Sequence, residues 1–151
     1  HSLINALLRY DNVKFVLISP NELKVPEYII ENIQKAGAEY KEVNKLEDVI
    51  GELDILYMTR VQKERFSDLI EYERVKNIYI LHNSMLQKAK PNMKILHPLP
   101  RVNEIAYDVD DNPHAYYIQQ AKNGLYAREA IFCYCLGISL DEVKNDKSII
   151  E

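Results

Sequence analysis

The sequence predicts an α/β fold built on an open, mainly parallel, doubly wound sheet with helices on both faces. Apolar runs of strand length alternate with amphipathic helical segments as far as His97. Several of these runs are almost continuously apolar, as in strands that helices cover on both sides. The first helical segment has no strand ahead of it, so we expect the sheet to lack its first strand. That strand is usually central, and its absence would leave unpaired strand edges.

Apolar runs bounded by polar or turn-forming residues define the strands. Five are expected, at residues 13–18, 38–43, 53–58, 78–81 and 93–96. The first is almost entirely apolar, whereas the second carries charged residues between its apolar ones and belongs nearer a sheet edge. Right-handed crossovers join parallel strands of this kind, which makes the expected fold Rossmann-like.

Segments with helical apolar spacing lie between these strands. They are expected at residues 2–10, 26–36, 46–50 and 84–89. A proline begins the second helix and a glycine follows it, as is usual at these two positions. Residues 66–72 are poorly patterned and are expected to form a loop with a helical turn. Residues 115–136 have helical spacing that Asn123 and Gly124 interrupt, which predicts either two helices or one kinked helix.

The composition is that of an ordinary globular chain of about one domain, with 151 residues, 47% hydrophobic and 28% charged. A net charge of −4 argues against a nucleic-acid partner. No apolar run approaches the ~20 residues that span a bilayer, so no membrane association is expected. Cys133 and Cys135 are two positions apart in an expected helix, which disfavours a disulfide or a shared metal. Free thiols and the lack of a visible targeting signal predict a cytoplasmic location.

Polar side chains gather where the third expected strand ends. Arg60 and Gln62 directly follow its apolar residues. The carboxyl edge of an open parallel sheet is where such folds bind ligands. The guanidinium of Arg60 suits a carboxylate or a phosphate, and the amide of Gln62 can both donate and accept. A solvated loop after a strand is the alternative, and these residues alone favour neither interpretation.

A second polar segment follows the strand at 93–96 and contains two prolines. Each proline fixes its own φ and restricts the residue before it, so His97 and Leu99 are expected to be extended. In so stiff a segment the backbone carbonyls point in set directions and can accept hydrogen bonds from a small ligand. The alternative is a rigid turn that only ends the strand. For His97 itself, polarising a substrate oxygen and making a structural hydrogen bond are both open.

Three stretches together resemble the carboxyl-terminal, aspartate-binding half of an aspartate carbamoyltransferase catalytic chain. They are DILYMTRVQKER (54–65), MKILHPLPRVNEI (93–105) and PHAYYIQQAKNGLYAR (113–128). The opening His1-Ser-Leu is also similar, and the resemblance extends to about residue 137. His-Pro-Leu-Pro, in place of His-Cys-Leu-Pro, separates the sequence from the ornithine-using relatives.

The resemblance implies transfer of the carbamoyl group of carbamoyl phosphate to the amino group of L-aspartate. The products are N-carbamoyl-L-aspartate and phosphate, in pyrimidine biosynthesis. The resemblance further implies that no metal and no organic cofactor takes part in the chemistry. It relies on positioning two substrates and stabilising an oxyanion. The resemblance also implies a homotrimer of catalytic chains and leaves open whether regulatory chains join it.

Matched by motif, Arg60 and Gln62 would hold the aspartate. The carbonyls of Leu99 and Pro100 would face the carbamoyl group and the attacking amine. Together with His97, these two residues are the candidate catalytic residues. A mobile loop whose ion pairs change on domain closure would contain Lys63, Glu64, Arg65, Glu71 and Tyr72. Arg101 and Glu104 are expected to form a structural or domain-closing ion pair.

We therefore expect an aspartate-binding domain at 1–137, followed by a polar tail at 138–151. Its final helix, 115–137, would dock on an amino-terminal domain that binds carbamoyl phosphate. The Ser-Thr-Arg-Thr-Arg phosphate motif of that domain does not occur in the sequence, so the chain alone is expected to be inactive. The alternatives are an amino-acid-binding module without catalysis, a transcarbamylase with another acceptor, or a structural or regulatory dimer domain. A scaffold needs neither Arg60-Val-Gln-Lys nor His-Pro-Leu-Pro, which favours the enzyme.

Overall fold

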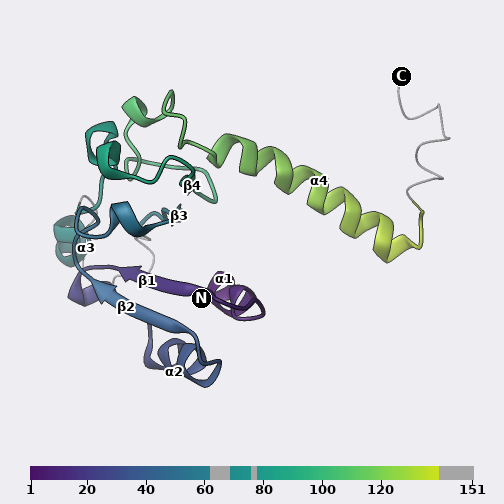
Figure 1. Cartoon of the computed structure of the whole chain (residues 1–151). Helices are drawn as coiled ribbons and strands as arrows, with labels where there is room; N and C mark the ends of the chain where they lie inside the picture. Colours follow the sequence, from purple (N-terminus) through teal and green to yellow (C-terminus); the bar gives the residue numbers. More distant parts are fainter. Residues whose placement is uncertain (62–68, 76–77, 140–151) are drawn as a thin grey trace.

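Two pairs of parallel strands form the centre of the computed structural model (Figure 1). The structure describes residues 1–61, 69–75 and 78–139. β1 (Lys14–Ile18) pairs with β2 (Glu39–Val43), and β3 (Ile55–Tyr57) pairs with β4 (Lys94–Leu96). Parallel strands with helical connections confirm the predicted α/β class.

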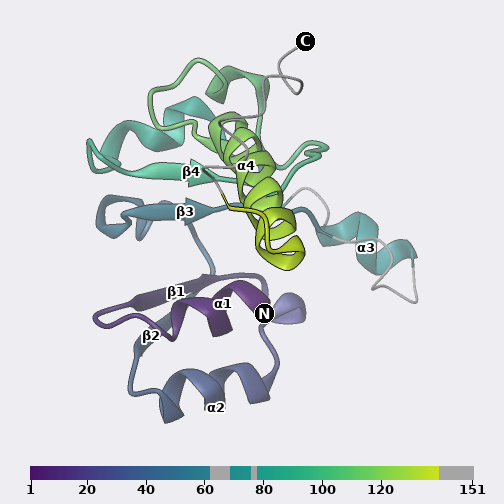
Figure 2. The same cartoon turned by 90° about the vertical axis from the view of Figure 1, so that its right-hand side faces the viewer.

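The two pairs lie next to each other but are not joined. In both views the strands follow the order β2, β1, β3, β4 (Figures 1 and 2). Among the described strands, β1 bonds only to β2 and β3 only to β4, so no ladder links their inner edges. Unpaired inner edges are what we expect of a doubly wound sheet without its central strand.

Helices cover one face of the first strand pair. α1 (Ser2–Leu7) and α2 (Glu27–Lys35) contact each other, and Ile29 and Ile33 of α2 pack against Phe15 of β1. The opposite face of β1 carries Val16 and Ile18, which pack against a second apolar cluster. Because successive strand residues point to opposite faces, β1 is covered on both sides. This double cover explains its nearly continuous apolar sequence.

The second apolar cluster surrounds β3 and β4. Leu81, Met93 and Ile95 are fully buried there. Ile95 forms a single bridge with Ala115, which places the segment before the final helix beside β4. This core holds the carboxyl ends of β3 and β4 in place.

The expected strand at 78–81 is wrong. Only Leu81 is paired there, in one bridge to Ile105. Leu81 donates to the carbonyl of Glu104 and accepts from the amide of Ala106, both at 2.9 Å. Leu81 is therefore the one buried residue of this run, which forms no ladder, and Ile78 at its start is exposed.

The shorter helices differ from their expected positions. The helix predicted at 46–50 is a turn followed by the 3₁₀ helix η2 (Ile50–Glu52), and η4 (Asn83–Lys88) replaces the one at 84–89. α3 (Leu69–Val75) overlaps the segment expected to be mainly loop. Two more 3₁₀ helices are η1 (Asn21–Leu23) and η5 (Tyr107–Val109).

The final helix, α4 (Tyr117–Leu136), is one continuous helix of 20 residues. Gly124 does not interrupt it, because an internal glycine costs only about 1 kcal/mol relative to alanine. Gly137 ends it with φ 68°, a left-handed conformation that glycine adopts freely. α4 extends away from the strands (Figure 1), and only Tyr117 among its residues is buried. None of the described helices is long and apolar enough to cross a membrane.

Candidate functional site

The two polar segments predicted from the sequence leave the same edge of one strand pair. Because β3 and β4 are parallel neighbours, their carboxyl ends lie together. The amide of Met58 donates to the carbonyl of Leu96 at 2.9 Å, which continues the pairing one residue past β3. Arg60 follows on one strand and His97 on the other, and the Arg60 side chain is exposed.

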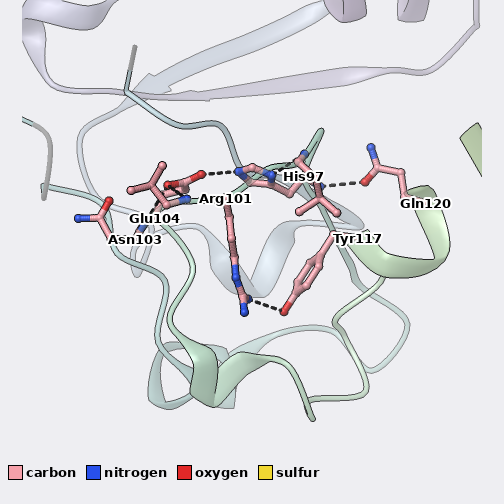
Figure 3. Close-up of polar contacts among 8 residues, drawn as sticks. His97, Arg101, Asn103, Glu104, Tyr117 and Gln120 are labelled. Atoms are coloured by element: carbon pink, nitrogen blue, oxygen red, sulfur yellow. Dashed lines mark hydrogen bonds and ion pairs between the residues drawn. The ribbon is translucent and has the colours of Figure 1, made fainter. Parts of the chain in front are cut away.

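His97 is buried, with 1% of its surface exposed, and both ring nitrogens have partners (Figure 3). Nδ1 lies 2.8 Å from the amide nitrogen of Leu99, and Nε2 lies 2.6 Å from Oε1 of Glu104. An amide N–H can only donate, so Nδ1 is the acceptor and Nε2 carries the proton that Glu104 accepts. The backbone N–H of His97 donates to Oε1 of Gln120, from the first turn of α4, at 2.8 Å.

Glu104 is also buried, and its second oxygen is fully used. Oε2 accepts from the backbone amides of Val102 and Asn103, each at 3.1 Å. Burial raises the pKa of the Glu104 carboxyl, but hydrogen bonds from backbone amides and from His97 lower it by more. The pKa of Glu104 therefore lies below its usual value, and the carboxylate is ionised at neutral pH.

Leu99 is not extended as the sequence predicted. Its φ is 48°, in the left-handed region, and the Leu99–Pro100 peptide is cis. The hydrogen bond from its amide to the His97 ring, two residues earlier, fixes the peptide unit that precedes Leu99. Within the described residues, no hydrogen bond reaches the carbonyl oxygen of Leu99 or Pro100.

The expected Arg101–Glu104 ion pair is wrong, because both oxygens of Glu104 are already occupied. Arg101 instead makes a two-pronged ion pair with Asp110, with Nη2 2.5 Å from Oδ2. Its guanidinium also donates to the Tyr117 hydroxyl at 3.3 Å and lies over the rings of Tyr107 and Tyr117.

Charges in this cluster shift the ionisation of its members. The hydrogen bond from Arg101 holds the pKa of Asp110 below its usual value. Burial, with the hydrogen bond to Asp110 and its negative charge, raises the pKa of Tyr117 to about 12, although Arg101 opposes this. The cluster links the end of the proline-containing segment to the start of α4.

The predicted site residues after Arg60 fall partly outside the described residues. Gln62, Lys63, Glu64 and Arg65 lie outside the described residues. Glu71 and Tyr72 lie on α3, and the Tyr72 side chain is half-buried. The binding role of Gln62 and the closure role of this loop stay predictions.

Two site residues were missed. Gln120 and Asp110 make contacts that depend on the path of the chain between β4 and α4. Their sequence spacing carried no signal for these contacts. In the described part of the chain, no three His, Cys, Asp or Glu residues are grouped closely enough to hold a metal ion. Cys133 and Cys135 are free thiols.

Comparisons with known proteins agree on one family. Residues 1–135 match the model described as "Aspartate/ornithine carbamoyltransferase, Asp/Orn binding domain". The chain is 60% identical over 147 residues to the aspartate carbamoyltransferase catalytic subunit of Bacteroides thetaiotaomicron, covering 97% of this chain and 47% of the relative. It is 60% identical over 139 residues to that of Clostridium acetobutylicum, covering 91% and 45%.

Solved structures give the same result and confirm the predicted doubly wound fold. The catalytic subunit of M. jannaschii aspartate transcarbamoylase has a TM-score of 0.80 and 43% identity, over 87% of this chain and 44% of that one. Aspartate transcarbamoylase from Trypanosoma cruzi, in complex with carbamoyl phosphate and aspartate, has a TM-score of 0.79 and 32% identity, over 87% and 44%. The chain spans about half the length of the relatives that it matches.

Glu104→Gln is expected to make folding stability less sensitive to acid. The lowered pKa of Glu104 means that its carboxylate stabilises the fold above the usual value of 4.5, and that this contribution is lost as pH falls through the folded-state pKa. Glutamine does not ionise and cannot accept at both side-chain positions. We expect a loss of about 1–3 kcal/mol in the free energy of unfolding at pH 7, and a smaller further loss in acid.

Urea unfolding at several pH values between 7 and 3 measures both quantities. Glu22→Gln, which removes an exposed carboxyl, is the matched control. If stability of the Glu104→Gln chain fell as steeply with acid as that of the unchanged chain, the lowered pKa would be contradicted.

Proposed function

Because residues 1–135 match its Asp/Orn binding domain, the chain belongs to the aspartate/ornithine carbamoyltransferase family, and we propose that it is the aspartate-binding half of an aspartate carbamoyltransferase. The proposed reaction moves the carbamoyl group of carbamoyl phosphate to L-aspartate, giving N-carbamoyl-L-aspartate and phosphate for pyrimidine biosynthesis. The observation that carries the proposal is that the segments with Arg60 and with Leu99–Pro100 leave the adjacent carboxyl ends of β3 and β4. Relatives at 60% identity, named aspartate carbamoyltransferase catalytic subunits, support aspartate over ornithine.

Arg60 is the proposed anchor for a carboxylate of aspartate. Its exposed guanidinium stands two residues beyond the last paired residue after β3, where a ligand can reach it. Two parallel N–H···O bonds to a carboxylate fix orientation as well as charge. Gln62 is proposed as a second aspartate contact, since its amide can donate and accept.

Leu99 and Pro100 are the proposed acceptors at the reacting centre. Both the amide of a carbamoyl group and the attacking amine carry N–H groups, which a backbone carbonyl can accept. Two carbonyl oxygens without a partner in the described chain, at the same sheet edge as Arg60, can therefore align both substrates. Such alignment supplies much of the rate when two reactants must meet.

Other parts of the proposal concern the longer protein. Carbamoyl phosphate would be held mainly by an amino-terminal domain, because this sequence contains no Ser-Thr-Arg-Thr-Arg motif. The loop with Lys63, Glu64, Arg65, Glu71 and Tyr72 would change its ion pairs as the two domains close. We also propose a homotrimer of catalytic chains and a cytoplasmic location.

The carboxyl-terminal part of α4, where large apolar side chains are exposed, is proposed to dock on that amino-terminal domain. Phe132 and Tyr134 are 67% and 88% exposed, and Ile131 and Leu136 beside them are exposed as well. Several large apolar side chains exposed together at one end of a helix are typical of an interface. The matched relatives are about twice as long as this chain, which supplies an occupant of the right size. Residues 1–137 would then form the aspartate-binding domain, with a polar tail at 138–151.

Arg60→Lys is expected to lower kcat/KM for aspartate about 10²- to 10³-fold, because a lysine keeps the charge but cannot make the two-pronged contact. The assay uses the natural polypeptide that contains these residues, with carbamoyl phosphate and either aspartate or ornithine. Arg9→Lys, at an exposed position just after α1, is the control. Unchanged aspartate kinetics in Arg60→Lys, or turnover of ornithine in preference to aspartate, would contradict the proposal.

Phe132→Asp is expected to destabilise the natural polypeptide by about 2 kcal/mol or more, because it would bury a charge in the proposed interface. In residues 1–151 alone the same change should alter the free energy of unfolding by less than about 0.5 kcal/mol, since Phe132 is exposed there. Thermal and urea unfolding of both proteins measure this difference. Asn123→Asp adds the same charge at an exposed polar position of α4 and serves as the control. Equal effects of Phe132→Asp in the two proteins would exclude docking at this surface.

A further inference from the structure

His97 is the buried titratable group nearest the proposed reacting centre, yet the proposed function gives it no contact with a substrate. The sequence left two roles open for it. It could polarise an oxygen of the substrate, or it could hold the protein in place. The contacts of its two ring nitrogens distinguish these roles.

A histidine that polarises a substrate oxygen needs a free ring N–H. His97 has none, because its Nε2–H is 2.6 Å from Glu104 and its Nδ1 accepts from the amide of Leu99 at 2.8 Å. The ring is also buried, with 1% of its surface exposed. A substrate could reach it only by displacing one of these two partners.

The bond from Leu99 fixes the backbone from which the proposed acceptors project. Leu99 holds φ 48°, a left-handed conformation that costs a non-glycine residue about 1 kcal/mol or more. The His97 ring accepts from the Leu99 amide and so fixes the peptide unit that precedes this residue. Partial packing of the Leu99 side chain on the apolar cluster around β3 and β4 holds the same residue from the other side.

Glu104 in turn fixes the ring. By accepting from Nε2–H, it selects the tautomer in which Nδ1 is free to accept. Glu104 is itself held by the amides of Val102 and Asn103, and Gln120 holds the backbone of His97 from α4. The chain of contacts therefore runs from β4 and α4 through the ring to the Leu99 amide (Figure 3).

We propose that His97 and Glu104 are positioning residues, which set the direction of the Leu99 and Pro100 carbonyls without touching a substrate. The inference rests on the proposed function, because it needs those carbonyls to be the acceptors. It gives His97 a role in holding the backbone, in place of a direct contact with a substrate.

Two variants of His97 separate positioning from direct chemistry. In His97→Asn the side-chain oxygen takes the place of Nδ1 and can still accept from Leu99. In His97→Gln the amide extends toward the place of Nε2 and leaves the Leu99 amide without its acceptor. Neither side chain can act as an imidazole, so a direct chemical role predicts equal losses.

In the natural polypeptide we expect His97→Asn to keep kcat within about fivefold of the unchanged enzyme. We expect His97→Gln to lose about 10- to 100-fold in kcat with little change in KM for aspartate, because displacement of reacting groups lowers the rate while Arg60 still binds. Losses that are equal in the two variants, or a loss in His97→Gln confined to KM, would overturn the proposal.

Hydrogen exchange at the Leu99 amide is the second measurement, and it does not depend on turnover. Slow exchange should persist in His97→Asn and become fast in His97→Gln, while exchange in β1 stays unchanged in both, as a check on folding. Equally fast exchange in the two variants would overturn the positioning role. If the enzyme without any substitution had no activity toward aspartate, the proposed function would be overturned. The exchange rates would still decide whether His97 holds the Leu99 amide.

Discussion

The buried contact between His97 and Glu104 is the interaction on which the site depends. It closes the segment between residues 97 and 104 upon itself, and it leaves Nδ1 of His97 to accept from Leu99. A buried polar group without a partner costs about 1–3 kcal/mol, so each member of the pair needs the other. In the described part of the chain, every buried side-chain nitrogen or oxygen has a hydrogen-bond partner. The side chains of His97 and Glu104 therefore form a fully hydrogen-bonded pair set into an apolar core.

Two further contacts anchor this unit to the fold. Gln120 reaches from α4 to the backbone of His97, and Arg101 binds Asp110 and Tyr117. The parallel pairing of β3 and β4 then makes the segment leave the sheet at the same edge as Arg60. The same contacts serve stability and the proposed function, because those that order residues 97–104 would also direct the Leu99 and Pro100 carbonyls toward a ligand.

Much of this arrangement could be predicted from the sequence. Apolar runs located four of the strands, and polar residues at the ends of two of them define the candidate site. The prediction of a strand at 78–81 is wrong, because only Leu81 is buried and bridged there, and an apolar composition does not show whether a segment has a neighbouring strand to pair with. The partners of Arg101 and the φ of Leu99 were also beyond the sequence, because both depend on how residues 97–120 fold back on β4.

The most direct measurement is the tautomer of His97, read from the ¹⁵N resonances of the histidine ring in the labelled protein at pH 7 and assigned with His97→Asn. We predict a neutral ring with the proton on Nε2 and none on Nδ1, because Glu104 accepts from the first and Leu99 donates to the second. A proton on Nδ1 would contradict it, since the ring could then not accept from Leu99 and could not hold the carbonyls in place.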